Sequence, residues 1–357
     1  MDLNEIRNKI DAIDREIVDR LNERVRLAGQ IGHIKLKEGK EVYVPSREEQ
    51  VFGKLTAHSD GPLKDAALRA IWREIISAAI SLEKPISIAY LGPEATYTHQ
   101  AAMKNFGTSL DYLGLATVPD VFSAVARKET DYGVVPVENS TQGTVISTLD
   151  MLIETELTIV AQIYLEISHG LISMSPLNEV TAVYSKDNAL GQCRQWLSRR
   201  LPGVDLIETT STAAAVKIAK ETPGAAAIAS RSAANLYDVP VIEEGIQDKQ
   251  NNVTRFFVIG REATPGLGKG RDKSTFVFTL PDNHPGALMK ALEPFNERGI
   301  NITKIESRPS RQKMWDYYFY IDIAGHRDDE DITAAIGELE QLSPLVRCLG
   351  SYPDTGL

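Results

Sequence analysis

Residues 133–144 read GVVPVENSTQGT, and this stretch decides how the centre of the 357-residue chain is interpreted. Its first half is a short apolar run that ends abruptly at Glu138 and Asn139. Buried parallel strands are short apolar runs, and ligands of α/β folds collect at their carboxyl ends. Gly143 would let the backbone approach a ligand closely. The stretch therefore predicts a small-molecule cleft, although, taken alone, a strand-to-helix turn capped by Ser140 or Thr144 is the simpler interpretation.

The composition is that of an ordinary globular protein, with 43% hydrophobic and 25% charged residues and room for two or three domains. A formal net charge of −10 gives no general attraction to nucleic acid or anionic membranes, so neither is expected as a partner. The sequence starts without an apolar leader and has no run long enough to span a bilayer, which predicts a cytoplasmic protein. Cys193 and Cys348 lack metal-ligand spacing, and we expect neither metal nor cofactor.

The N-terminal segment, residues 3–36, predicts one long amphipathic helix. Its apolar seam recurs every three or four residues, at Leu3, Ile6, Ile10, Ile13, Ile17 and Leu21. Continued along the helix, the same seam reaches Arg24 and Lys35, which differ by about 20° in direction and by about 16 Å along the axis. A cation on a core face is costly unless it is paired, so an acidic group or an anionic ligand should lie between them. Arg7 points roughly 100° away from Arg24, so only a second copy of the helix could bring it there.

Two further helices complete this module. Proline in Val44-Pro45-Ser46 restarts the helix after a break at residues 38–40, and Arg47 and Glu48 follow at once. A third helix carries the stripe Leu68, Trp72, Ile76 and Ala79, and one more turn adds Glu83. A dimerising helical hairpin laced with salt bridges would explain these charges. Their place in the seam, rather than on the outer face, favours a site for an anion.

These residues resemble the all-helical class of chorismate mutase, an intertwined dimer. The resemblance implies the substrate-binding residues Arg7, Arg24, Lys35, Val44, Arg47, Glu48, Ala79 and Glu83. Arg7 from the partner chain, Arg24 and Arg47 would hold two carboxylates, Lys35 would face the ether oxygen, and Glu48 would take a hydroxyl. Arg24, Lys35 and Glu83 are the predicted catalytic residues. The rearrangement needs no nucleophile or base, so catalysis would be selection of the folded conformer with cationic stabilisation of the departing oxygen.

Two positions depart from a form of this motif. Val44 stands where some members have aspartate, and Glu83 where some have glutamine, a donor to the ether oxygen. Because a carboxylate cannot donate, we expect Glu83 to be protonated during turnover, with a pKa above about 4.3. Mutase activity should then weaken as pH rises, and Glu83→Gln should flatten the profile.

From residue 86 the chain alternates strand and helix in two groups, which predicts two α/β lobes with a cleft between them. The predicted strands are 86–92, 132–137, 157–163, 181–185, 204–208, 225–229 and 254–259. The predicted helices are 100–106, 121–127, 148–154, 212–220 and one through Ala189, Cys193 and Leu197. The last strand should return to the first lobe and place Thr254 at the cleft.

Four separated segments of this region resemble prephenate dehydratase: 90–94, 133–144, 185–193 and 252–256. The resemblance implies a two-lobed α/β domain of the periplasmic-binding-protein type, with Thr254 as the essential catalytic residue. It also implies Asn139, Ser140, Ser185, Gln192, Arg255 and Phe256 as substrate-binding residues. A threonine is too weak an acid to give up its proton outright, so Thr254 would donate a hydrogen bond to the leaving oxygen. Ala95 replaces the usual glycine, which costs about 1 kcal/mol if the turn needs a positive φ.

The C-terminal part follows a glycine-rich segment, 263–272, that we interpret as a linker because its spacing fits no phosphate-binding loop. The order strand, helix, strand, strand, helix, strand over 273–357 is ferredoxin-like α+β. Two of its segments, 284–288 and 306–309, resemble the ACT regulatory domain that is attached to this dehydratase. The resemblance implies a phenylalanine site at a subunit interface, formed by Gly286, Ala287, Leu288, Glu306, Ser307, Arg308 and Pro309. Without the two segments, a structural α/β cap would explain this part.

We therefore predict a multidomain chain with an all-α module at 1–84, a two-lobed α/β domain at 85–262, a linker at 263–272 and a ferredoxin-like domain at 273–357. The resemblances imply conversion of chorismate to prephenate and then to phenylpyruvate, with inhibition by phenylalanine. They imply a homodimer or a higher homo-oligomer. Two alternatives stay open: dehydration of arogenate, the aminated analogue, and a non-catalytic amino-acid-sensing protein.

Overall fold

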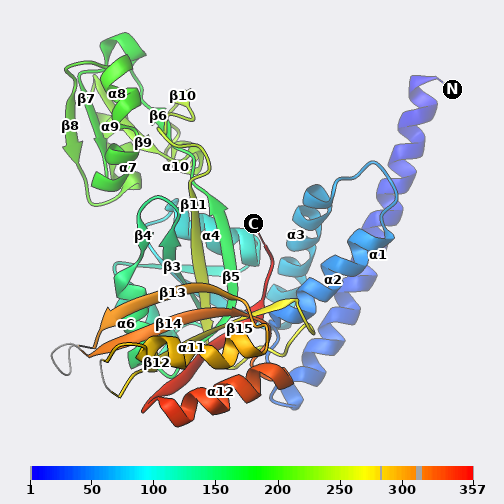
Figure 1. The fold of residues 1–357 in the computed structure, drawn as a ribbon. Coiled ribbons are helices and arrows are strands. Elements are labelled where there is room, and N and C mark those ends of the chain that lie inside the picture. Colours follow the sequence, from blue (N-terminus) through cyan, green and yellow to red (C-terminus); the bar gives the residue numbers. More distant parts are fainter. Residues whose placement is uncertain (1, 282–283, 311–315, 357) are drawn as a thin grey trace. The chain divides into compact units, whose positions relative to one another are not determined.

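The computed structural model describes residues 2–281, 284–310 and 316–356, and its helices and strands are drawn in Figure 1. The chain divides into two compact units. The first contains residues 1–87 and 105–111, and the second contains 88–104 and 112–357. Among the helices that the structure describes, none has both the length and the apolar character that a bilayer span needs.

The first unit is the predicted all-α module, with helices α1 (Leu3–Lys37), α2 (Pro45–His58) and α3 (Asp65–Glu83). Helix α1 ends before Gly39, which adopts a φ of +67°, a value that glycine tolerates without strain. Pro45 occupies the first turn of α2 as predicted, where its missing N–H costs nothing. The predicted stripe of α3 is buried at Leu68, Ile76 and Ala79.

The seam of α1 is left uncovered within this unit. Its apolar side chains are about half exposed: Leu3, Ile6, Ile10, Ile13 and Ile17. An amphipathic helix gains most of its stability in water by burying its apolar face. This face of α1 therefore has the character of a contact surface.

The second unit contains a two-lobed α/β domain, which confirms that prediction. The sheet of the first lobe has the order β2-β1-β3-β11-β5, with β4 added beside β3. Its elements are β1 (Ser87–Leu91), α4 (Tyr97–Phe106), β2 (Asp111–Leu115), α5 (Val118–Ala126), β3 (Tyr132–Asn139), β4 (Gly143–Thr144), α6 (Ile146–Glu154), β5 (Thr158–Glu166) and β11 (Val253–Gly260). Strand β11 pairs with β3 and β5, so the last strand does return to the first lobe (Figure 1).

The second lobe is built on a sheet of order β10-β6-β9-β7-β8. Its elements are β6 (Gly170–Ile172), the 3₁₀ turn η1 (Leu177–Glu179), β7 (Ala182–Ser185), α7 (Asp187–Gln192), α8 (Arg194–Arg200), β8 (Asp205–Glu208), α9 (Thr212–Glu221), β9 (Ala225–Ala229), α10 (Arg231–Tyr237) and β10 (Val241–Glu244). The chain enters this lobe after β5 and leaves it before β11.

Three local predictions in this unit were wrong or incomplete. The helix through Ala189 and Leu197 is two helices, because Cys193 has φ −113° and ψ 9° between them. Helix α6 is capped by Val145 without a side-chain hydrogen bond, whereas Ser140 or Thr144 had been expected. The short elements β2, β6, β10 and α10 were not predicted, since each lies among residues without clear periodicity.

The C-terminal part has the predicted ferredoxin-like order. Its elements are β12 (Asp272–Thr279), α11 (Ala287–Glu297), β13 (Ile302–Pro309), β14 (Tyr317–Ala324), α12 (Glu330–Leu342) and β15 (Val346–Pro353), with sheet order β13-β14-β12-β15. The third strand of the predicted order, β14, begins at Tyr317 within the described residues. Helices α11 and α12 cover one face of this sheet, where Phe278 and Ile321 are buried.

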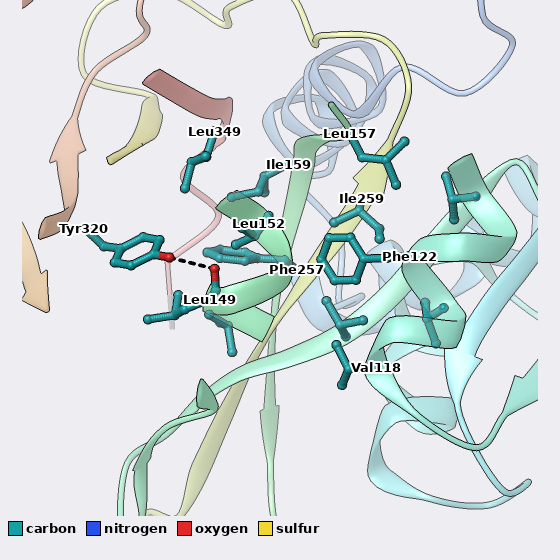
Figure 2. Packing of buried hydrophobic residues seen from close by; sticks show 14 of the residues in the cluster. Val118, Phe122, Leu149, Leu152, Leu157, Ile159, Phe257, Ile259, Tyr320 and Leu349 are labelled. Atoms are coloured by element: carbon teal, nitrogen blue, oxygen red, sulfur yellow. Dashed lines mark hydrogen bonds between the residues drawn. The ribbon is translucent and has the colours of Figure 1, made fainter. Parts of the chain in front are cut away.

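The other face of this sheet shares a core with the first lobe. Figure 2 shows Tyr320 and Leu349 beside Leu152 and Phe257 of the first lobe. The Tyr320 hydroxyl also donates to the carbonyl oxygen of Leu149 at 2.7 Å. The ferredoxin-like domain is therefore packed on the first lobe and not merely tethered to it. Gly350 allows part of this approach, since a Cβ there would collide with the backbone of Ile159.

Candidate active sites

The helical unit brings two cations and one acid together, as predicted. Arg24 and Lys35 extend from α1 toward Glu83 at the end of α3. Gly32 makes room for the acid, because a Cβ there would lie 2.6 Å from a Glu83 carboxylate oxygen. Lys35 Nζ donates to the carbonyl oxygen of Val42 at 2.9 Å. One terminal nitrogen of Arg24 is buried without a hydrogen-bond partner among the described residues, so it can donate to a bound acceptor.

The pKa values of this cluster follow from its partial burial. Burial raises the pKa of Glu83 above its ordinary value, while Lys35 and Arg24 oppose the rise. Burial also lowers the pKa of Lys35, and Glu83 opposes that fall. The raised pKa favours the protonated carboxyl that a donor role would need.

Glu48 has a partner that the sequence did not reveal. Its carboxylate lies 2.5 Å from a guanidinium nitrogen of Arg73, and both side chains are largely buried. The Arg73 guanidinium also lies over the ring of Phe52, 4.9 Å from its centroid. The second carboxylate oxygen of Glu48 is buried without a partner among the described residues, so it can still accept a substrate hydroxyl. Arg73 follows Trp72 of the α3 stripe by one residue, so the stripe alone did not identify it.

Among the described residues, the side chains of the remaining predicted mutase residues form no hydrogen bond with the side chains of Arg24, Lys35 and Glu83. Arg47 is exposed and donates to Gln50 at 3.3 Å. Val44 is partly buried at the start of α2, and Ala79 is buried. Arg7 is exposed and stands about 26 Å from Arg24 along α1, so a single chain does not bring it to the cluster.

A second site lies in the two-lobed domain, where a cavity of about 390 Å³ opens beside the β3–β4 hairpin. It is lined by Thr141, Gln142, Asp187, Asn188, Gly191, Gln192, Gln195, Gln247, Asp248, Lys249 and Asn252. These residues come from the first lobe, from the second lobe and from the segment that joins them. Among the described residues, no group of three or more His, Cys, Asp or Glu side chains could hold a metal ion.

Asn139 organises a hydrogen-bond network next to this cavity. Its side-chain oxygen accepts the backbone N–H groups of Thr141 and Gln142 at 3.0 and 3.1 Å, which fixes the orientation of the amide. Its nitrogen therefore donates, to Asn252 Oδ1 at 2.7 Å and to Thr254 Oγ1 at 2.8 Å. Asn139 and Thr254, each predicted to belong to the cleft, are brought together because β3 and β11 pair at these two residues.

The direction of this bond decides what Thr254 can do. Because Asn139 donates to it, the Thr254 oxygen is an acceptor and its own proton remains available. In the part of the chain that the structure describes, this hydroxyl donates no hydrogen bond of its own. The arrangement leaves Thr254 ready to donate to a bound molecule.

Gln192 extends the network into the second lobe. Its carbonyl oxygen accepts from Asn252 Nδ2 at 3.0 Å, and its nitrogen donates to Thr141 Oγ1 at 3.2 Å. The same carbonyl oxygen lies 2.7 Å from His169 Nε2, and His169 Nδ1 lies 2.9 Å from the hydroxyl of Tyr97. Sequence reasoning missed His169 and Tyr97, because neither lies in a recognisable pattern.

Among the described residues, no hydrogen bond joins the side chains of the other predicted dehydratase residues to the Thr254 hydroxyl. Arg255 points to the opposite face of β11, where its guanidinium donates to Gln162, Asp322 and Tyr352. Ser185 is fully buried and donates to the carbonyl oxygen of Ile228 at 2.6 Å. Phe256 is buried and Ser140 donates to the backbone of Asn251. The roles of these four side chains in binding substrate stay predictions.

The β13 residues that are predicted to bind phenylalanine lie on two opposite faces of the strand. Glu306 accepts from Thr144 at 2.8 Å, and Arg308 donates to Asp150 at 3.3 Å, so both point toward the first lobe. Ser307 and Pro309 alternate with them and pair with Phe319 and Tyr317, on the opposite face.

The turn at the start of α11 supplies the other segment. Gly286 has a φ of +85° there, which explains a glycine at this position. Ala287 and Leu288, which follow it, begin α11 and are partly buried.

The fold and the sites define a fused enzyme with two separate active sites and a C-terminal ferredoxin-like domain. Comparison with family models agrees: chorismate mutase type II matches residues 6–84, prephenate dehydratase 88–264 and the ACT domain 274–341. The chain belongs to the family of bifunctional chorismate mutase/prephenate dehydratases, and it is an enzyme of both classes.

The bifunctional relatives are similar over nearly the whole chain. A bifunctional chorismate mutase/prephenate dehydratase of Aquifex aeolicus is 47% identical over 99% of this chain and 98% of its own length. The protein of the same name from Neisseria gonorrhoeae is 41% identical over 97% of this chain and 96% of its own length. A solved prephenate dehydratase from Arthrobacter aurescens in complex with L-Phe is 34% identical, with a TM-score of 0.70, over 75% of this chain and 90% of that one.

Proposed function

We propose that the helical unit converts chorismate to prephenate and that the two-lobed domain converts prephenate to phenylpyruvate. The observation that carries the second step is the Asn139–Thr254 hydrogen bond, which leaves the Thr254 proton available. The buried nitrogen of Arg24 without a partner carries the first, since it awaits an acceptor such as a carboxylate. Within the α/β domain, Asn139 and Gln192 line the site beside Thr254. The domain boundaries are proposed at 84/85, 262/263 and 272/273.

In the mutase reaction, the protein selects a conformer and stabilises charge. Arg24 binds a carboxylate, and Lys35 faces the ether oxygen on which negative charge develops as the C–O bond breaks. Protonated Glu83 donates to the same oxygen, and the free oxygen of Glu48 accepts the ring hydroxyl. Preorganised charges of this kind lower the barrier because they need no reorganisation when the reaction occurs.

In the dehydratase reaction, prephenate loses its ring carboxylate as carbon dioxide. The electrons of the broken C–C bond enter the ring as the C–OH bond breaks. The leaving oxygen takes one proton from solution overall and departs as water. Thr254 donates a hydrogen bond to this oxygen in the transition state, without giving up its proton outright. Aromatisation of the ring drives the step.

We further propose that phenylalanine binds the C-terminal domain and inhibits the dehydratase. The turn at Gly286, Ala287 and Leu288 and strand residues 306–309 would form its site, completed by a second subunit. The Glu306–Thr144 hydrogen bond supports a direct route to the β3–β4 hairpin. The solved relative in complex with L-Phe supports the choice of ligand.

A cytoplasmic homodimer is the proposed assembly. The exposed apolar seam of α1 would be buried against a second copy of the same helix. Only such a copy could bring Arg7 to the Arg24 cluster, because the two lie about 26 Å apart on one helix.

The test is to give the purified full-length protein chorismate and to follow prephenate and phenylpyruvate with and without phenylalanine. Appearance of phenylpyruvate, suppressed by phenylalanine, is the expected result. Accumulation of prephenate without phenylpyruvate would overturn the dehydratase assignment and leave the mutase assignment intact. In parallel reactions the protein is given prephenate or arogenate directly. We expect slower turnover of arogenate than of prephenate, and faster turnover of arogenate would identify it as the substrate.

A further inference from the structure

His169 is a buried polar side chain with no part in the proposed chemistry. It lies between β5 and β6, in the segment that leads from the first lobe into the second, and is 2% exposed. Its backbone N–H donates to Gln247 Oε1 at 3.0 Å, and its carbonyl oxygen accepts from Ile246 N at 3.0 Å. Both residues belong to the returning segment, so the two connections between the lobes hold His169 in place.

The network around Asn139 determines which ring nitrogen of His169 carries the proton. Asn139 donates to Asn252 Oδ1, so Asn252 presents its nitrogen to Gln192. Gln192 therefore presents its carbonyl oxygen, and His169 Nε2 must donate to that oxygen. Nδ1 then carries no proton and can only accept, and it shares the single proton of the Tyr97 hydroxyl, 2.9 Å away, with the carbonyl oxygen of Ser168, which lies 2.8 Å from the same hydroxyl. Burial lowers the pKa of His169, which favours this neutral ring.

The donation from His169 fixes the Gln192 amide in one of its two orientations. If the amide were reversed, its nitrogen would face two donors, His169 Nε2 and Asn252 Nδ2. In the observed orientation the nitrogen donates to Thr141 Oγ1, which in turn donates to Asn139 Oδ1 at 2.6 Å. Gln192 is the member of this network that comes from the second lobe. The network is therefore complete only while Gln192 lies against the first lobe.

We propose that His169 is a positioning residue for the dehydratase reaction. By donating to Gln192, it keeps the second lobe docked on the Asn139 network in the orientation that leaves the Thr254 proton free for the substrate. This inference rests on the proposed dehydratase function, and His169 acts through Gln192 without touching the substrate. Tyr97 supports the ring from its other nitrogen.

The test compares two substitutions in the full chain, with mutase activity on the same molecule as an internal control for folding. His169→Phe keeps an aromatic ring but removes both nitrogens, whereas His169→Gln keeps a donor near the position of Nε2. We expect His169→Phe to lower dehydratase kcat about ten- to a hundredfold while KM for prephenate changes less than threefold. His169→Gln should recover most of the loss, and mutase activity should stay within twofold in both variants.

If the wild-type protein dehydrates prephenate, three outcomes with the variants would overturn the inference about His169. They are unchanged kcat in His169→Phe, an equal loss in both variants, and a change confined to KM. If His169→Phe does not fold, His169→Asn replaces it in the test, because the asparagine side chain is too short for its amide to reach Gln192. A wild-type protein without dehydratase activity would instead refute the proposed function, so the two failures are distinguishable.

Discussion

The helical cluster and the threonine network hold their reacting groups in opposite ways. Around Arg24, the helical unit gathers unlike charges and leaves a buried donor without a partner. Around Asn139, the α/β domain uses uncharged side chains whose hydrogen bonds are satisfied, and it leaves a single proton free. The first site therefore depends on charge that a ligand must complete, and the second depends on the direction of hydrogen bonds. The two kinds of site should respond differently to substitution and to pH.

The largest expected effect is on the charged cluster. Arg24→Ala should lower mutase kcat/KM by about a hundredfold to a thousandfold, because the Arg24 guanidinium stabilises negative charge of the substrate in the transition state. Dehydratase activity on supplied prephenate should stay within twofold. Arg20→Ala is the matched control, since Arg20 lies one turn earlier, is exposed and pairs only with Glu23 among the described residues. Equal losses in the two variants would show that the helix, and not the site, had been damaged.

A change of similar size should follow from removing the free proton. Thr254→Val keeps the shape of the side chain but has no hydroxyl, so dehydratase kcat should fall about a hundredfold or more. Thr254→Ser should retain most of the activity because it keeps the donor. Steady-state rates with prephenate measure both, and a Val variant with normal kcat would rule out the donor role.

Dependence on pH should separate the two sites more finely. The pKa of Glu83 is raised by burial, so its protonated form persists to higher pH than that of an exposed glutamate. Mutase activity that needs this proton is present below the pKa and declines, by up to tenfold per pH unit, as pH rises through it. Glu83→Gln should flatten the profile, and the dehydratase profile of the same variant should not change. An unaltered mutase profile in Glu83→Gln would remove the need for a protonated carboxyl.

The smallest effect should concern communication with the C-terminal domain. Lys304 of β13 pairs with Glu138 at 2.9 Å, directly beside Asn139. Lys304→Met should raise the phenylalanine concentration needed for half-inhibition about three- to tenfold, while phenylalanine binding measured by calorimetry changes less. Lys269→Met, at an exposed lysine of the linker that precedes this domain, is the control. Inhibition unchanged by Lys304→Met would place the route elsewhere.

Much of the fold follows from patterns within single segments. The seam of α1 and the short apolar strands β1, β3 and β11 are each periodic enough to be read alone. The return of the last strand to the first lobe was also predicted, and the pairing of β11 with β3 then brings Thr254 to Asn139. Ala95 has the positive φ, 62°, on which its predicted cost depended.

The remainder depends on which side chains meet, and no single segment contains that information. Arg73 reaches Glu48 from another helix, and His169 reaches Gln192 from the segment that joins the two lobes. In one case a signal was present: side chains alternate along a strand, so Thr254 and Arg255 could not both face the cleft. The Glu-Ser-Arg-Pro segment of β13 divides between two faces for the same reason.

The most direct test of two separate sites on one chain is to mix the Arg24→Ala and Thr254→Val proteins and to measure phenylpyruvate formed from chorismate. Each variant alone should form almost none, the first for want of prephenate and the second because prephenate accumulates. The mixture should restore phenylpyruvate formation, since prephenate released by one protein is consumed by the other. No restoration, although each variant keeps its other activity, would contradict the account by showing that the two sites do not work independently.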